Sequence, residues 1–424
     1  MNDQRLFLRK MFETAVEAVT PARCLPPYLP DPAAVHGDIV IVGAGKAAAE
    51  MARIAGDKYG GRARGLVVTR YGHDADGPVS PAIEVVEASH PVPDEAGRQA
   101  ALRMIDLVHG LGPDDLIICL LSGGGSALLS APAPGLALAD KQAVTAALLR
   151  SGATISEINC IRKHLSAVKG GRLALAAAPT PLLTLAISDV PGDDPAVIAS
   201  GPTVADPTTF VEAQALLQKF GITEPESVVD HIRAGRDETP KQGDPRLAHA
   251  TFRMIATPIA ALEAAAVIAR DAGYTPVMLG DDLEGESRDV AAQHAALALD
   301  LQRKGQRAAI LSGGETTVTI KGGAASTGRG GPNAEYALAL AVALNGAAGV
   351  SAIACDTDGI DGSEDNAGAI VTPETCRRAI AAGLDPATYL QANDSYGFFQ
   401  ALDDLVMTGP TRTNINDFRV ILVD

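Results

Sequence analysis

The chain has 424 residues, of which 47% are hydrophobic and 20% are charged, and its formal net charge is −16 at pH 7. This length predicts two domains, and the composition is typical of a globular protein rather than a disordered one. The acidic balance argues against nucleic acid and acidic membranes as partners, because both require a basic surface.

Cysteine usage and the apolar runs predict the compartment. The five cysteines are scattered and none forms a C-x-x-C pair, which indicates a reducing environment without zinc or a disulfide framework. The N-terminal segment begins with charged residues and lacks the apolar stretch of a signal peptide. Apolar runs stay far short of the roughly 20 residues that span a bilayer. We therefore expect a soluble, cytoplasmic protein, a monomer or a homodimer, with no membrane partner.

In chain order, apolar residues first recur at helical spacing over residues 3–20. Apolar runs that predict strands follow at 38–42, 65–69, 83–87, 116–121 and 182–187, with helical patterns between several of them. This alternation is typical of a parallel, doubly wound sheet.

A polar stretch over 221–250, punctuated by glycine and proline, predicts the end of this first unit. The strand pattern then restarts near 252–256, 275–279, 308–311, 316–320, 350–355 and 418–423. We therefore predict an α/β protein of two Rossmann-like domains, 1–245 and 246–424, with largely parallel sheets.

Three glycine-rich loops carry polar groups suited to an anion: 122–126, 312–315 and 328–331. A strand, a glycine turn and a helix start together point backbone N–H groups at an oxyanion, and glycine lets the backbone approach it. Each loop alone is compatible with a tight turn, and none fits the P-loop pattern. Together they predict a polyphosphate ligand. The predicted phosphate- or nucleotide-binding residues are Ser122, Gly123, Gly124, Gly125, Ser126, Ser312, Gly313, Gly314, Glu315, Gly330, Gly331 and Asn333.

Residues 41–48 combine a strand end, a glycine turn and a helix start, and they formally meet the relaxed dinucleotide pattern G-x-G-x-x-A. The acidic residue expected after the next strand is missing, and Arg70 stands there instead, which would suit the 2′-phosphate of NADP. An NADP-linked dehydrogenase therefore stays open. Lys46, which a dinucleotide loop does not require, can instead hold a carboxylate or phosphate as a point charge.

Cationic side chains gather between Asn159 and Gly171. On a helix, Arg162, Ser166 and Lys169 share one face, which predicts contacts with an anionic substrate. His164 is a candidate base, although a lone histidine in a basic helix more often hydrogen-bonds a neighbour.

Two acidic clusters follow apolar runs. Asp189 and Asp193 come after the run at 182–187, and Asp356 and Asp358 come after the run at 350–354. Carboxylates at the carboxyl ends of parallel strands lie where open α/β sheets bind ligands, and hard oxygen ligands suit Mg²⁺. We predict these four as metal ligands, with Asx turns as the structural alternative for the second cluster. Cations, glycine loops and carboxylates are the parts that phosphoryl transfer requires.

These segments resemble the class II glycerate kinases, whose C-terminal part is called the MOFRL domain. The matches run almost from end to end. They include Gly43–Ala47, Ser89–Asp94, Leu121–Ala127, Asn159–Gly171, Ser188–Thr203, Ser312–Glu315, Gly330–Glu335, Thr357–Gly362, Asn393–Tyr396 and Thr408–Asn414. The resemblance implies ATP- and Mg²⁺-dependent phosphorylation of D-glycerate to 2-phosphoglycerate, in a cleft between two α/β domains.

The resemblance also implies roles for single residues. Lys46 would be catalytic, as a cation that positions the substrate or stabilises the transition state. Arg162 and Lys169 would also bind the substrate, and the catalytic Asp189 would accept or orient the proton of its hydroxyl. The family often has arginine where this chain has Pro332, so Arg329 would have to supply that catalytic cation. Independently of the resemblance, ligand loops come from both halves of the chain. We therefore predict a cleft that is open without ligand and closes with glycerate and ATP, with the glycine-rich ligand loop 322–331 as its closing segment.

Two alternatives remain beside the kinase. Some bacterial members of the family are named hydroxypyruvate reductases, so an NAD(P)H-dependent reductase is one alternative. The other is a sugar-acid or nucleotide sensor that binds without turnover.

Overall fold

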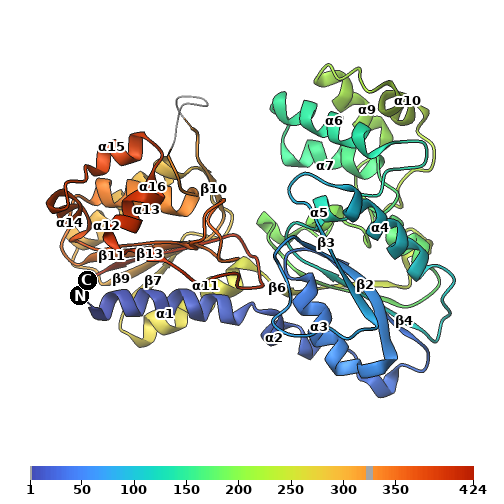
Figure 1. Ribbon diagram of the computed structural model, residues 1–424, viewed down its shortest axis with the longest axis horizontal. Coiled ribbons are helices and arrows are strands. Elements are labelled where there is room, and N and C mark those ends of the chain that lie inside the picture. Colours follow the sequence, from blue (N-terminus) through green and yellow to red (C-terminus); the bar gives the residue numbers. More distant parts are fainter. Residues whose placement is uncertain (1, 321–327) are drawn as a thin grey trace. The chain divides into compact units, whose positions relative to one another are not determined.

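The computed structural model describes residues 2–320 and 328–424. It divides into two compact units (Figure 1). The first unit is Pro21–Ala256, and the second unit joins the first 20 residues to Thr257–Asp424. This division differs from the predicted ranges 1–245 and 246–424 at both ends of the first unit.

The first unit is built on a six-stranded sheet in the order β3-β2-β1-β4-β5-β6, with every neighbouring pair parallel. Its strands are β1 (Ile39–Ala44), β2 (Ala63–Arg70), β3 (Ile83–Ala88), β4 (Leu116–Leu121), β5 (Leu182–Ile187) and β6 (Ala250–Ala256). The central strands β1 and β4 are buried along almost their whole length, which explains their continuous apolar runs. The predicted parallel, doubly wound sheet is confirmed for this unit.

Helices cover this sheet and extend beyond it. The α-helices are α2 (Pro21–Cys24), α3 (Ala48–Tyr59), α4 (Glu95–Val108), α5 (Gly125–Leu128), α6 (Leu138–Arg150), α7 (Ile155–His164), α8 (Arg172–Ala177), α9 (Phe210–Lys219) and α10 (Glu226–Ala234). Short 3₁₀ turns are η1 (Pro26–Tyr28), η2 (Pro32–Ala34), η3 (Gly60–Arg62), η4 (Pro191–Asp193), η5 (Ile198–Ser200) and η6 (Pro245–Leu247).

Four of these helices, α6, α7, α9 and α10, form a separate layer at one end of the first unit, which we call the helical cluster (Figure 1). It has its own apolar core, in which Leu148, Ile161 and Phe210 are buried. The starts of α7 and α9 are fixed by capping boxes at Thr154 and Thr209, which satisfy backbone donors that a helix start leaves open.

The second unit contains a six-stranded sheet in the order β13-β12-β11-β14-β9-β7 and a two-stranded sheet of β8 and β10. The strands are β7 (Thr275–Met278), β8 (Glu284–Glu286), β9 (Ala308–Ser312), β10 (Glu315–Thr317), β11 (Val350–Asp356), β12 (Gly368–Val371), β13 (Leu405–Val406) and β14 (Asp417–Val423). The α-helices are α1 (Asn2–Ala18), α11 (Pro258–Asp271), α12 (Ser287–Arg303), α13 (Pro332–Leu344), α14 (Thr375–Ala381), α15 (Pro386–Gln391) and α16 (Ser395–Leu402).

The prediction of two α/β units is confirmed, but the expectation of a largely parallel sheet is wrong for the second unit. In its large sheet β7 and β9 are parallel, whereas β9–β14, β14–β11, β11–β12 and β12–β13 are antiparallel. The C-terminal strand β14 inserts between β9 and β11, so the order in space departs from the order in sequence.

The differences at the unit boundaries have a clear physical cause. Strand β6 lies after the predicted boundary, yet it pairs with β5 at the edge of the first sheet. Helix α1 packs in the second unit through two aromatic contacts. The ring of Phe7 stacks on that of Tyr274 with centroids 6.0 Å apart, and the ring centroids of Phe12 and Phe418 are 5.8 Å apart. In the part of the chain that the structure describes, no helix is long and apolar enough to cross a membrane.

Candidate functional site

The order of the first sheet defines where a ligand is expected. From β1 the chain runs outward through β2 and β3, and it then returns to β4 on the other side of β1. In open parallel sheets of this order, ligands bind at the carboxyl ends of the two strands where the direction reverses. Here those ends carry the turn with Lys46, after β1, and the loop Ser122–Ser126, after β4.

The two loops are hydrogen-bonded to each other. The Lys46 N–H donates to the Gly123 carbonyl at 2.8 Å, the Ala47 N–H donates to Ser122 Oγ at 3.0 Å, and the Ser122 N–H donates to the Ala44 carbonyl at 3.1 Å. The approach is so close that a Cβ on Gly45 would lie 2.1 Å from Ser122 Oγ. The glycines of the dinucleotide-like turn are therefore needed for loop packing.

The loop after β4 leaves N–H groups open. Within the described residues, those of Gly123, Gly124 and Ser126 donate to no acceptor. Gly124 has φ +82°, and a Cβ there would lie 3.2 Å from the ring of His90 and 3.6 Å from Cγ of Lys46. The half-buried side chain of Lys46 thus lies against this loop. Open backbone amides beside a cation are suited to binding an anion.

Asp189 and Asp193 lie on the same edge of the sheet. They follow β5, which is parallel to and paired with β4, and both are half-buried. The structure therefore brings together three predicted segments within one unit: the Lys46 turn, the Ser122–Ser126 loop and the Asp189 segment.

Lys169 lies behind this loop. Its side chain is 1% exposed, and its ammonium group donates to the Ser126 carbonyl at 2.7 Å and to the Ala199 carbonyl at 3.5 Å. Burial, together with the nearby charges of Lys141 and Arg162, holds the pKa of Lys169 well below its ordinary value. Its observed contacts support the loop.

The predicted helical face of Arg162, Ser166 and Lys169 is wrong, because α7 ends at His164. Beyond the helix, the Ser166 hydroxyl donates to the Ala131 carbonyl at 3.1 Å and accepts from the N–H groups of Val168 and Lys169. Arg162 alone of the three belongs to α7. Its neighbour Lys141, on α6, was missed: in sequence it resembles any lysine near the start of an exposed helix.

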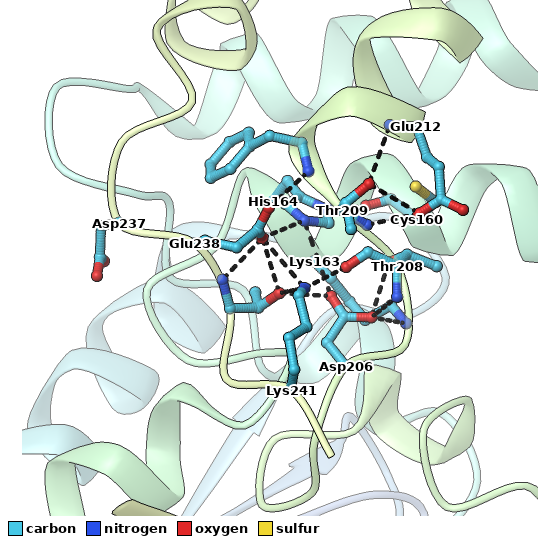
Figure 2. A network of polar contacts seen from close by, with 12 residues as sticks. Cys160, Lys163, His164, Asp206, Thr208, Thr209, Glu212, Asp237, Glu238 and Lys241 are labelled. Carbon is cyan, nitrogen blue, oxygen red and sulfur yellow. Dashed lines mark hydrogen bonds and ion pairs between the residues drawn. The ribbon is translucent and has the colours of Figure 1, made fainter. Parts of the chain in front are cut away.

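The other titratable groups of α7 belong to a structural network (Figure 2). Lys163 pairs with Asp206 at 2.6 Å, and both side chains are buried. His164 Nδ1 contacts the Cys160 carbonyl at 2.8 Å and its Nε2 contacts Glu238 at 3.0 Å. His164 therefore hydrogen-bonds its neighbours, as expected for a structural histidine.

Glu238 joins this network to α9. Burial acts to raise the pKa of Glu238, but the N–H groups of Phe210 and Thr239 and the ammonium of Lys241 outweigh it and hold the pKa at about 2. The carboxylate thus stays charged and keeps α7 in place against α9 and the segment 238–241.

In the second unit, the predicted loop at 328–331 leads into α13, but a carboxylate already occupies the start of this helix. Asp361 accepts from the N–H groups of Asn333 at 2.9 Å and Ala334 at 2.8 Å. The Asn333 amide also donates to Asp417 at 2.6 Å. Burial raises the pKa of Asp361 to about 7. The first amides of α13 are thus used within the protein, and Gly331 and Asn333 have structural contacts.

Arg329 is held by an acidic partner. Its guanidinium pairs with Glu364 at 2.5 Å and lies over the Tyr396 ring, 4.2 Å from the centroid. Pro332, where the family often has arginine, is the first residue of α13, a position that suits proline. Residues 322–327 of the predicted closing segment lie outside the described residues.

The loop after β9 is tightly packed in the second unit. The Gly313 carbonyl accepts from Arg419 at 2.8 Å, and a Cβ on Gly314 would lie 2.1 Å from the Leu283 carbonyl. The predicted residue Glu315 begins β10 and is exposed, whereas Ser312 ends β9 and is buried.

The acidic cluster after β11 forms Asx turns, because Asp356 accepts from the Asp358 N–H at 2.9 Å and Asp358 accepts from the Ile360 N–H at 2.8 Å. The four predicted metal ligands are divided between the units: Asp189 and Asp193 belong to the first unit, and Asp356 and Asp358 belong to the second. Among residues 2–320 and 328–424, no three His, Cys, Asp or Glu side chains gather as a metal site. The predicted metal ligands stay a prediction.

The geometry defines an α/β protein with a candidate site for a small anion at one edge of the first sheet. There the open backbone amides of the loop after β4 lie beside Lys46. Two family models match the chain: "Domain of unknown function (DUF4147)" over residues 7–233 and "MOFRL family" over residues 308–417. Glycerate kinases are among the relatives that are more than 30% identical over nearly the whole chain, so the chain belongs to the class II glycerate kinase family.

Named relatives cover nearly the whole chain. A protein of Agrobacterium vitis named "Putative hydroxypyruvate reductase" is 52% identical over 424 residues, 99% of this chain and 94% of the relative. The D-glycerate 2-kinase of Thermotoga maritima is 40% identical over 420 residues, 98% of this chain and 97% of the relative. The glycerate kinase of Homo sapiens is 34% identical over 98% of this chain and 92% of the relative.

Two solved structures have the same fold. The glycerate kinase of Thermotoga maritima matches with a TM-score of 0.90 at 38% identity, over 100% of both chains. A protein of Pyrococcus horikoshii matches with a TM-score of 0.82 at 35% identity, over 99% of this chain and 98% of that chain.

Proposed function

We propose that the protein is a kinase that transfers the γ-phosphate of ATP to the 2-hydroxyl of D-glycerate, giving 2-phosphoglycerate and ADP. The observation that carries this proposal is the edge of the first sheet, where Lys46 lies against a loop with open amides beside the Asp189 segment. The proposal is supported by 40% sequence identity, over 98% of this chain, to the D-glycerate 2-kinase of Thermotoga maritima.

The chemistry assigned to these residues is positioning and charge neutralisation. Asp189 accepts the proton of the 2-hydroxyl of D-glycerate, and the oxygen of that hydroxyl forms a bond to the γ-phosphorus. The bond between the γ-phosphorus and the bridging oxygen breaks, and ADP leaves with that oxygen. The ammonium of Lys46 and the open amides of Gly123 and Gly124 stabilise the charge on the transferring group. Arg329 stays a candidate for a second cation, on condition that it leaves Glu364.

The carboxylates after β5 fit Mg²⁺, which takes one or two carboxylates together with phosphate oxygens and water. Asp189 and Asp193 would hold it. The ion would supply charge neutralisation at the phosphates of ATP.

The name hydroxypyruvate reductase among the relatives makes a reductase the second candidate. The dinucleotide-like turn does not favour it, because its amides are occupied: Gly45 donates to the Val68 carbonyl at 3.0 Å and Lys46 donates to Gly123. A pyrophosphate at such a turn requires open N–H groups.

A coupled ADP-release assay with D-glycerate, L-glycerate and hydroxypyruvate tests the proposal. We expect ADP formation with D-glycerate, and analysis of the product should identify the 2-phosphate. Oxidation of NADPH with hydroxypyruvate and no ADP formation would instead establish the reductase. Binding of D-glycerate and ATP without turnover would establish a sensor.

A further inference from the structure

A cluster of cations without acidic partners lies in the helical cluster of the first unit. Lys141, near the start of α6, is 6% exposed, and its Nζ atom is buried and has no hydrogen-bond partner in the described residues. Arg162 of α7 is half-buried, and within residues 2–320 and 328–424 it forms no hydrogen bond or ion pair. The two side chains are close enough for the charge of Arg162 to act on Lys141.

The surroundings of this pair add further groups that suit an anion. Asn159 precedes Arg162 by three residues on α7, so the two share a helix face. Its side chain is 5% exposed, and its amide oxygen is buried without a donor. The amide can turn its NH₂ group toward an anion. Lys169 is a third basic group at this place, although burial and the charges of Lys141 and Arg162 hold its pKa well below the ordinary value.

The scarcity of carboxylates at this place is informative, because the chain has 51 acidic residues against 35 Lys and Arg. A buried charge that lacks a partner is costly. The neighbouring Lys163 avoids that cost by pairing with Asp206. No carboxylate of the described residues neutralises Lys141 and Arg162, so an anion from outside the chain would stabilise both charges.

The cluster adjoins the candidate site. Lys169 donates to the Ser126 carbonyl of the open-amide loop. Gln142, next to Lys141, donates to the Pro93 carbonyl at 2.7 Å, in the same loop as His90, whose ring contacts Gly124. The anion bound by Lys141 and Arg162 would thus lie beside the loop assigned to the phosphate.

We propose that Lys141 and Arg162 bind the carboxylate of the substrate acid, with Asn159 as a further hydrogen-bond donor. A guanidinium matches a carboxylate with two parallel N–H···O bonds, and the lysine adds a compact charge. This subsite rests on the proposed function, since it assigns the acid group of the same substrate. Lys141 and Arg162 are substrate-binding residues, and the reacting hydroxyl stays with Asp189 and Lys46.

The test compares the wild type with Lys141→Met, which keeps the apolar stem and removes the charge. Steady-state kinetics should show the KM for D-glycerate raised about 100-fold, because a buried charged contact is lost, and the KM for ATP changed less than twofold. Arg162→Gln should behave likewise. Lys219→Met is the matched control: Lys219 is exposed in the same helical cluster and pairs with Glu157, so both KM values should stay unchanged.

Calorimetric titration with D-glycerate, D-lactate, hydroxypyruvate, glycerol and inorganic phosphate, without nucleotide, separates this subsite from the reaction. The wild type should bind the three carboxylic acids and not glycerol, and Lys141→Met should lose that binding. Equal binding of D-glycerate by both proteins, or a raised KM for ATP alone, would overturn the subsite. Wild-type protein that binds the acids but forms no ADP would instead refute the kinase and leave the subsite standing.

Discussion

Two groups of charged side chains in the helical cluster differ in how they are neutralised. Lys163 and His164 are paired with Asp206 and Glu238, and every member has a partner at hydrogen-bond distance (Figure 2). Lys141 is buried and Arg162 half-buried in the same layer, without any acidic partner in the described residues. The first group is built to hold helices together. The second group keeps its charge available, at a cost in stability.

The comparison teaches which cations to examine for function in an acidic protein. Residues 159–169 place cations of both kinds within a few positions of each other, so the sequence pattern alone does not separate them. The presence or absence of a carboxylate in space does so. Four predictions, ordered by the size of the expected change, test this distinction.

Lys163→Met should cause the largest change, a loss of about 3–5 kcal/mol in the free energy of unfolding, because it leaves the buried carboxylate of Asp206 without its partner. Urea denaturation followed by circular dichroism measures it. Asp206→Asn, which leaves the lysine unpaired, should also destabilise the protein. A change below about 1 kcal/mol would show that this pair is no structural element.

Lys46→Ala should lower kcat/KM for D-glycerate by a factor of about 100 or more, which corresponds to about 2.7 kcal/mol of transition-state stabilisation. The urea midpoint should change little, since the side chain lies at a loop rather than in the core. The coupled assay and the denaturation curve together separate this from Lys163→Met, which acts on stability. Near-normal turnover in a folded Lys46→Ala protein would remove Lys46 from the site.

Lys141→Met should stabilise the ligand-free protein at pH 7 by about 1–2 kcal/mol while it impairs substrate binding. Burial and the charge of Arg162 lower the pKa of Lys141 from 10.5 to about 7. Between these values the unfolded chain binds more protons than the folded one, so wild-type stability rises with pH across this window. The advantage of the variant should therefore be fully present below pH 7 and fade toward pH 10. A variant that is less stable at pH 7 would contradict an uncompensated charge.

The smallest effect is a fraction of a proton taken up on substrate binding. At pH 8 the ammonium of Lys141 is partly deprotonated, and a bound carboxylate should raise its pKa. Calorimetry in two buffers of different ionisation enthalpy should detect the uptake at pH 8 and little of it at pH 6. Because Lys169 is a second buried lysine nearby whose pKa is also lowered, the difference between wild type and Lys141→Met isolates Lys141. Equal uptake by both proteins would assign the proton to Lys169.

The first sheet was predictable because its strands are buried apolar runs: the predicted ranges 116–121 and 182–187 coincide with β4 and β5. Strand direction in the second unit was not predictable, since β14 reaches its place between β9 and β11 from the far end of the chain. The Lys46 turn and the loop after β4 were found from glycine and charge patterns. Lys141 carried no such signal, because burial and the absence of a partner are properties of the folded chain.

The division of the chain also sets an order of events during synthesis. The first unit is one continuous segment, whereas α1 packs with α11 and β14 of the second unit. Ala18 and Pro258 are separated by about 240 residues, which a ribosome adds in roughly 10–50 s.

During that interval α1 lacks its partner, and its buried face, with Leu8, Met11 and Phe12, is uncovered. The first unit, in contrast, can complete its sheet as soon as β6 has left the ribosome. A nascent chain stalled after the first unit should therefore already protect that sheet from protease, while α1 stays cleavable until the second unit has been made.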